Sequence, residues 1–160
     1  MTGGERGTHF QIYHTSIYNQ ATINGNIKVE QGATLNGGIF NTNPYATSNA
    51  TITGNIEVAG TINAEQYAIF NVFANITGNI DIKQNATLSQ GIYNQTEIDG
   101  QIKVEGTVKG FGIRNHSQGT IKKGIVIEEK ATISEAINNQ GKIEQNIEVK
   151  GYVGGGIHNS

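Results

Sequence analysis

Apolar residues along this chain occupy alternate positions in short runs, and the runs return at nearly regular intervals. One run consists of a small residue, Ile, a variable residue and Asn. Its seven copies are Ser16-Ile17-Tyr18-Asn19, Gly38-Ile39-Phe40-Asn41, Ala68-Ile69-Phe70-Asn71, Gly91-Ile92-Tyr93-Asn94, Gly112-Ile113-Arg114-Asn115, Ala136-Ile137-Asn138-Asn139 and Gly156-Ile157-His158-Asn159. Successive copies are separated by 22, 30, 23, 21, 24 and 20 residues. A recurrence at this period is typical of a repeat architecture.

Two further runs lie between successive copies of the first. One has the pattern Ile-x-Gly-x-Ile-x-Val/Ile; it begins at Ile23, Ile52, Ile76 and Ile98, and returns from Ile121 and Ile143 with its Gly replaced or shifted. The other is a small residue, Thr and an apolar residue, at 33–35, 60–62, 86–88, 106–108 and 131–133. Apolar positions with a period of two predict β-strands. Each repeat of about 22 residues is therefore expected to hold three short strands.

The repeat predicts an all-β fold, a single-stranded parallel β-helix (β-solenoid) of six to seven coils. Leucine-rich repeats have similar lengths, but this chain has only two Leu. Separate hairpins are disfavoured because the Asn-Gly turn signal is nearly absent. In a solenoid each repeat makes one coil, and equivalent residues stack at about 4.8 Å. The crossover rule predicts a right-handed winding.

The long step of 30 residues predicts an insertion at about 42–49, which holds Pro44, the only proline. Residues 17–160 are expected to form the solenoid, and residues 1–16 an N-terminal cap or partial coil. The chain has neither a signal-peptide apolar core nor a series of membrane-barrel strands. We therefore interpret it as an excised fragment or a small stand-alone solenoid.

One Asn column is expected to be structural. Each Asn lies two residues after its Ile and so points to the same side of the strand. A buried Asn must be hydrogen-bonded, and a column of Asn side chains satisfies this when each amide donates to the carbonyl of the next coil. The predicted ladder is Asn19, Asn41, Asn71, Asn94, Asn115, Asn139 and Asn159.

Composition and charge exclude several classes of function. The 24 Ile, 22 Gly, 19 Asn and 16 Thr suit strands and turns. A net charge of −2 gives no footprint for nucleic acid, and no segment is apolar enough to insert into a membrane as a helix. The chain has no Cys, and its four His residues, at 9, 14, 116 and 158, lack metal-ligand spacing. We expect no metal site and no cofactor.

The variable residue between Ile and Asn is expected to face outward. Its column begins with four aromatic residues in adjacent coils, which predicts an exposed strip nearly 15 Å long at about 4.8 Å per coil. Exposed apolar surface of this kind often marks an interaction site. Two alternatives stay open: the insertion covers the strip, or the strip is only a stacking ladder. The candidate binding residues are Tyr18, Phe40, Phe70 and Tyr93, with Tyr45 and Tyr67 nearby in sequence.

Catalysis is not expected. Glu57 and Asp81 share an outward column in adjacent coils, at the one-coil spacing that a pair of catalytic carboxylates could use. Their column also contains Lys28 and Lys103, so it is interpreted as a solvated face of mixed charge.

The repeats resemble the passenger domains of bacterial autotransporters. The resemblance rests on Ala-Thr-Leu-Asn-Gly-Gly-Ile-Phe-Asn (33–41), Gly-Thr-Ile-Lys-Lys-Gly-Ile (119–125) and Ile-Asn-Asn-Gln-Gly-Lys-Ile (137–143). Such passengers are right-handed parallel β-helices displayed on, or released from, Gram-negative cells, and many are adhesins. The resemblance implies an extracellular or outer-membrane surface location.

These observations predict a non-enzymatic adhesion or structural module. Its expected partner is a glycan or a protein on a host or neighbouring cell, contacted through the aromatic strip. Self-association through the strip or the solenoid ends is also expected. A polysaccharide-processing β-helix enzyme and a phage tail-fibre segment stay open as alternatives.

Overall fold

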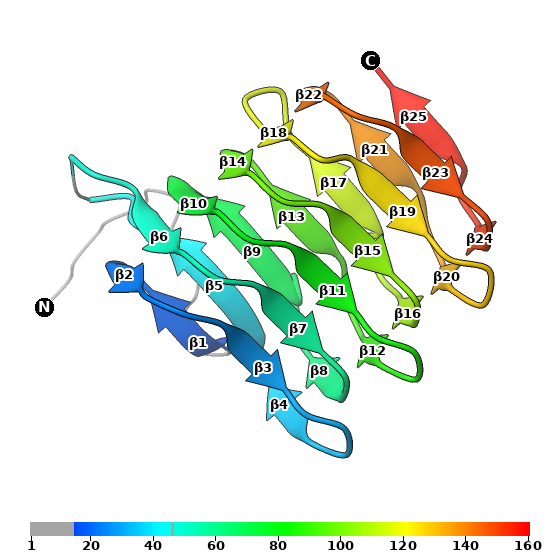
Figure 1. The fold of residues 1–160 in the computed structure, drawn as a ribbon, viewed down its shortest axis with the longest axis horizontal. Coiled ribbons are helices and arrows are strands. Elements are labelled where there is room, and N and C mark those ends of the chain that lie inside the picture. Colours follow the sequence, from blue (N-terminus) through cyan, green and yellow to red (C-terminus); the bar gives the residue numbers. More distant parts are fainter. Residues whose placement is uncertain (1–14, 46) are drawn as a thin grey trace, which may run out of the picture.

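The computed structural model describes residues 15–45 and 47–160, and over these residues the chain consists of 25 strands joined by turns. The predicted all-β parallel solenoid is confirmed, with about 23 residues per turn and about six turns (Figure 1). Each turn contributes short strands to four parallel sheets, which we name A to D in chain order. Residues 1–14, which make up most of the predicted cap and include His9 and His14, lie outside the described residues.

The strands of each sheet come from successive coils. Sheet A contains β1 (Thr15–Asn19), β5 (Gly38–Thr42), β9 (Ile69–Val72), β13 (Ile92–Asn94), β17 (Ile113–Asn115), β21 (Ile137–Asn139) and β25 (Ile157–Asn159). Sheet B contains β2 (Thr22–Ile23), β6 (Ala50–Ile52), β10 (Ala74–Ile76), β14 (Glu97–Ile98), β18 (Thr120–Ile121) and β22 (Lys142–Ile143).

The other two sheets are built in the same way. Sheet C contains β3 (Ile27–Val29), β7 (Ile56–Val58), β11 (Ile80–Ile82), β15 (Ile102–Val104), β19 (Ile125–Ile127) and β23 (Ile147–Val149). Sheet D contains β4 (Thr34–Asn36), β8 (Thr61–Asn63), β12 (Thr87–Leu88), β16 (Thr107–Val108), β20 (Thr132–Ile133) and β24 (Tyr152–Val153).

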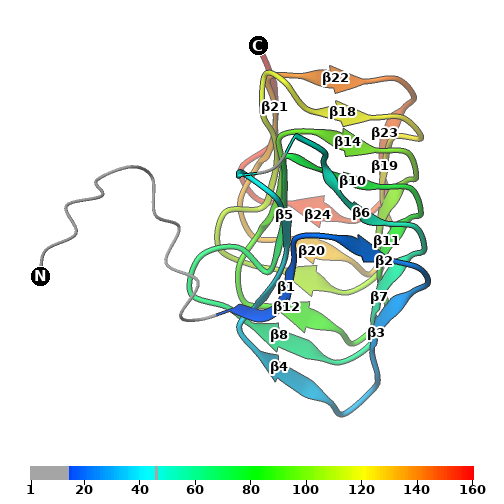
Figure 2. The ribbon, with the colours of Figure 1, turned by 90° about the vertical axis from the view of Figure 1, so that its left-hand side faces the viewer.

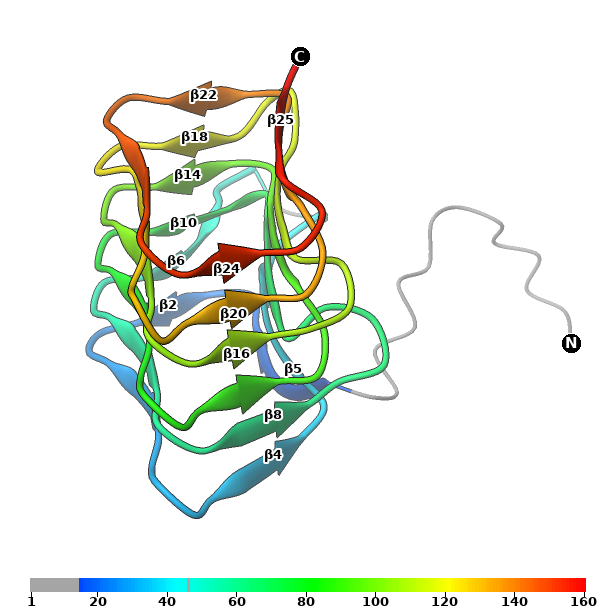
Figure 3. The ribbon, with the colours of Figure 1, turned by 90° about the vertical axis from the view of Figure 1, so that its right-hand side faces the viewer.

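The four sheets form the sides of a quadrilateral tube. Figures 2 and 3 show sheet B opposite sheet D and sheet A opposite sheet C. Seen from the C-terminal end, the chain runs anticlockwise through sheets A, B, C and D as it approaches the viewer (Figure 3). This winding is right-handed, as the crossover rule predicts for parallel strands.

Each coil has four strands where three were predicted, because the run between its two Ile residues bends in the middle, at the Gly in the first four copies. The first half of the run pairs in sheet B and the second half in sheet C. The bend brings the backbones of successive coils into contact at the glycines. A Cβ added to Gly78 would collide with the carbonyl oxygen of Gly54, and one on Gly100 with that of Gly78.

The interior is a set of apolar columns. In sheet A, for example, Ile69 pairs with Ile92 and Ile92 pairs with Ile113. Ile52, Ile80, Ile102 and Leu88 are all 0 % exposed. Burial of each such side chain contributes about 1.5–3 kcal/mol, and this repeated gain holds the coils together.

The corner between sheets C and D alternates between a long and a short form. Long corners close with a turn in which Ala33, Ala86 and Ala131 donate their N–H to the carbonyl three residues earlier. In the alternate coils the same position is Gly60, Gly106 or Gly151, which precedes Thr61, Thr107 or Tyr152. A Cβ on any of these glycines would strike backbone carbonyls of the preceding long corner. The structural repeat at this edge is therefore two coils.

The extra residues of the longest coil lie in two places. One is the predicted insertion, between the end of β5 at Thr42 and the start of β6 at Ala50. The other is the connection from sheet D to sheet A, where β8 ends at Asn63 and β9 begins at Ile69. In the preceding coil the same connection is the single residue Gly37. The second lengthening was not predicted, and it lies beside the aromatic column.

Candidate functional site

The predicted Asn ladder is confirmed at the corner between sheets A and B. Each Nδ2 donates to the Oδ1 of the Asn in the next coil. The six steps from Asn19 to Asn159 measure 2.7, 3.0, 2.8, 2.8, 2.8 and 2.7 Å. The five inner members, from Asn41 to Asn139, are at most 6 % exposed. The second N–H of the amide bonds backbone carbonyls at the start of sheet B, as Asn71 does with Glu97 at 3.1 Å.

A second Asn column at the corner between sheets B and C was missed by the sequence analysis. The side-chain oxygens of Asn26, Asn55 and Asn79 accept from the backbone N–H of Asn55, Asn79 and Gln101 at 2.8, 2.8 and 2.9 Å. The signal for it is the recurring Gly-Asn-Ile, which becomes Gly-Gln-Ile at 100–102 and then ends. Both Asn columns therefore satisfy polar groups at the corners of the tube.

The aromatic column lies on the outer face of sheet A, in the predicted register. Tyr18 pairs with Phe40, Phe40 with Phe70, and Phe70 with Tyr93. The rings of Phe40 and Phe70 stack at 4.8 Å between centroids, and those of Phe70 and Tyr93 at 5.4 Å. These residues form an apolar cluster separate from the interior core. Of its members, Tyr67 and Tyr93 are half-buried.

The prediction of an exposed strip is wrong for its two phenylalanines. Phe40 is 3 % exposed and Phe70 is 2 % exposed. Tyr67, on the lengthened connection before β9, packs over the column with its ring 6.0 Å from Phe70 and 5.0 Å from Tyr93. Phe111 extends this cover, at 5.1 Å from Tyr67. The accessible aromatic surface is therefore at the margins of the cluster.

Two tyrosines mark the N-terminal margin of the column. Tyr45, in the insertion, is 79 % exposed. Burial raises the pKa of Tyr18, and the neighbouring Tyr45 phenol raises it further, while a hydrogen bond from Gln20 lowers it. The insertion thus adds an exposed ring beside the half-buried first ring of the column.

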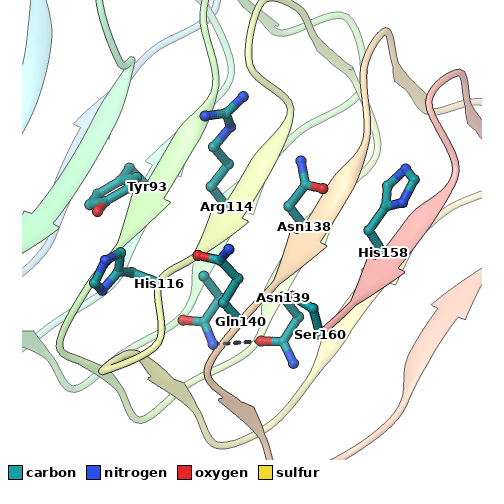
Figure 4. A pocket seen from close by; sticks show the side chains of 9 residues that line it. Tyr93, Arg114, His116, Asn138, Asn139, Gln140, His158 and Ser160 are labelled. Carbon is teal, nitrogen blue, oxygen red and sulfur yellow. Dashed lines mark hydrogen bonds between the residues drawn. The ribbon is translucent and has the colours of Figure 1, made fainter.

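At the other margin the column changes from aromatic to polar, and a groove begins. Tyr93 pairs with Arg114, Arg114 with Asn138, and Asn138 with His158. Figure 4 shows these four side chains in one row, pointing out of sheet A. The groove has a volume of about 430 Å³, within the usual range for ligand sites. A second row, two residues further along the strands, consists of His116, Gln140 and Ser160.

The groove combines one permanent cation with neutral polar groups. Its lining includes Arg114 and two His residues and contains neither Asp nor Glu. The guanidinium Cζ of Arg114 lies 5.1 Å from the centre of the Phe111 ring. Burial raises the pKa of Tyr93; Tyr67 raises it further, and Arg114 lowers it. The site can therefore bind polar or anionic groups beside an aromatic ring.

The candidate carboxylates lie on sheet C, away from this groove. Asp81 pairs with Glu57 on one side and with Lys103 on the other. Lys28 contacts Glu57 at 3.7 Å. Burial is the largest cause of a raised pKa for Asp81, and Lys83 opposes the shift. This arrangement is the mixed-charge face that the sequence predicts.

No family model, curated protein or solved structure matches this chain. Among residues 15–45 and 47–160 no cluster of three or more His, Cys, Asp or Glu is suited to hold a metal ion. The described residues also form no helix long and apolar enough to cross a membrane.

Proposed function

We propose that this chain is a non-enzymatic adhesive and structural module, secreted or displayed at a cell surface. It contacts a glycan or a surface protein of a host or neighbouring cell through the outer face of sheet A. The resemblance of its repeats to autotransporter passengers supports a location at the Gram-negative cell surface.

One observation carries this proposal: most of the exposed aromatic side chains among the described residues lie around sheet A, whereas Tyr152 lies on sheet D. Tyr45 and Phe111, 79 % and 40 % exposed, flank the stacked column, and Tyr93 lines the groove beyond it. Aromatic rings combine large apolar area with little conformational freedom, so they suit contact surfaces. A solenoid that served only as a spacer would not need this grouping.

The test is a binding screen of the chain against a panel of glycans and extracellular-matrix proteins. The variant Tyr45→Ser/Phe111→Ser removes exposed rings at both margins while leaving the buried phenylalanines in place. Tyr152→Ser is the matched control, because Tyr152 is 62 % exposed on sheet D. Binding that is lost in the double variant and kept in the control supports the proposal. A wild-type chain that binds nothing on either panel overturns the adhesive role.

A further inference from the structure

We propose that the groove from Tyr93 to His158 binds an acidic saccharide, whose carboxylate pairs with Arg114 and whose sugar ring lies against Tyr93. This inference rests on the proposed function, because it names the ligand class for the same face. Three features of the groove carry it: the charge, two amides that make no hydrogen bond within the described chain, and the end of the aromatic stack.

The lining of the groove contains a positive charge, that of Arg114, and no carboxylate. Arg114 is exposed, and among the described residues it has no carboxylate partner. Lys122, directly after β18, differs from Arg114 because its ammonium lies 2.6 Å from Asp99 and 3.0 Å from Glu97. A guanidinium matches a carboxylate in a planar, bidentate pair. A ligand carboxylate would supply the partner that Arg114 lacks within the protein.

Two amides in the groove are also available. Asn138 and Gln140 flank Asn139 on β21 and the turn that follows. Asn139 lies in the ladder and bonds Asn159, whereas the side chains of Asn138 and Gln140 make no hydrogen bond to the rest of the described chain. Each amide offers two N–H donors and one acceptor oxygen. Paired hydroxyls on a sugar ring present this same mixture of donors and acceptors.

Tyr93 is the last ring of the stack. Phe70 packs against it from the preceding coil at an interplanar angle of 14°. The following coil has Arg114 in the same column, so the surface of Tyr93 on that side lines the groove. The C–H face of a sugar ring is apolar and flat enough to lie on this surface. A carboxylate on that sugar, or on its neighbour, would then reach Arg114 one step of about 4.8 Å away.

The geometry disfavours a peptide as the ligand. The groove runs across the strands, and β13, β17 and β21 are each paired on both sides. A peptide would find no free strand edge for backbone pairing there. A saccharide binds through side-chain contacts, and the row from Tyr93 to His158 spans about 14 Å, enough for more than one ring.

The experiment measures binding by calorimetry with five probes. Oligogalacturonate and sialyllactose are acidic saccharides, methyl-esterified oligogalacturonate and lactose are their neutral counterparts, and polyglutamate is acidic without sugar. We expect at least one acidic saccharide to bind, with its neutral counterpart and polyglutamate about tenfold or more weaker. Arg114→Gln should reduce the affinity for the acidic saccharide by roughly 10–100-fold, the loss of a charged hydrogen-bonded pair. Asn138→Ala should weaken both the acidic and the neutral saccharide.

Lys123→Gln is the matched control, because it removes one exposed positive charge at the corner between sheets B and C. Its affinity should equal that of the wild type, and thermal melts should show that all variants fold. Equal losses in Arg114→Gln and Lys123→Gln would overturn the inference in favour of net charge. Failure of both acidic saccharides to bind, while the screen finds a neutral glycan or a matrix protein, overturns it and leaves the proposed function standing. If nothing binds in either experiment, both proposals fall.

Discussion

Substituting one inner member of the Asn ladder tests the mechanism that closes the corner between sheets A and B. In Asn94→Ala, Asn115 loses the donor that lies 2.8 Å from its Oδ1, and Asn71 loses the acceptor that lies 2.8 Å from its Nδ2. The carbonyls of Thr96 and Thr120 lose donors at 3.2 and 3.3 Å. Asn94 itself is 1 % exposed, so water does not easily replace it.

The magnitude follows from these partners. A net hydrogen bond contributes about 1 kcal/mol, and a buried group left unpaired costs about 1–3 kcal/mol. The two ladder bonds dominate, so we expect Asn94→Ala to lower the free energy of unfolding by about 3 kcal/mol. For a chain of this length, that corresponds to a melting temperature lower by roughly 6–12 °C. Urea and thermal unfolding followed by circular dichroism would measure both quantities.

Two other asparagines provide the controls for this measurement. Asn138 lies on the outer face of sheet A and makes no side-chain hydrogen bond within the described chain, so Asn138→Ala should stay within about 0.5 kcal/mol of the wild type. Asn159 has one ladder neighbour, so Asn159→Ala should cost less than Asn94→Ala. If Asn94→Ala and Asn138→Ala unfold alike, the ladder does not stabilise the corner and the reasoning is refuted.

Three further measurements test the packing and the charges. Burial raises the native pKa of Asp81 above its ordinary 3.8. Its contribution therefore favours folding below pH 3.8 and is lost as the pH rises through the native pKa. The free energy of unfolding of Asp81→Asn, measured in urea, should therefore rise relative to that of the wild type between pH 3 and pH 7. An unchanged difference across this range would contradict the reasoning. Gly106→Ala should cost about 1–3 kcal/mol, because its Cβ would lie 2.5 Å from the Ala86 carbonyl oxygen. Phe70→Ala should cost about 3–5 kcal/mol, a large loss that a truly exposed ring would not show.

The fold could be predicted from the sequence because each structural column repeats the same residue type. Ile at alternate positions shows which side of a strand faces inward, and stacking identical residues then aligns every coil. The Asn ladder follows from the same logic, since Asn41 and Asn71 need each other as partners. The alternating corners are also visible in the sequence, where Ala33, Gly60 and Ala86 show the exchange of Ala and Gly from coil to coil.

The burial of Phe40 and Phe70 could not be predicted in this way. It depends on the connection that carries Tyr67 and on the turn that carries Phe111, and neither follows the repeat. Gly110 and Gly112 adopt positive φ of 59° and 67° in that turn. A periodic pattern predicts which side chains point away from the core. Whether those side chains are exposed to solvent depends on the irregular segments that lie over them.

The same distinction explains where specificity can reside in this tube. Inward columns are held uniform because each Ile or Asn is packed or bonded by the equivalent residue of the next coil. The outer column of sheet A stacks in this way only as far as Tyr93, and after it the column changes to Arg, Asn and His. Because the coils fix the spacing of these side chains at about 4.8 Å, the order of residues in the column is also their order along the groove. A change at Arg114 or Asn138 therefore alters one point of the contact surface and leaves the scaffold that presents it intact.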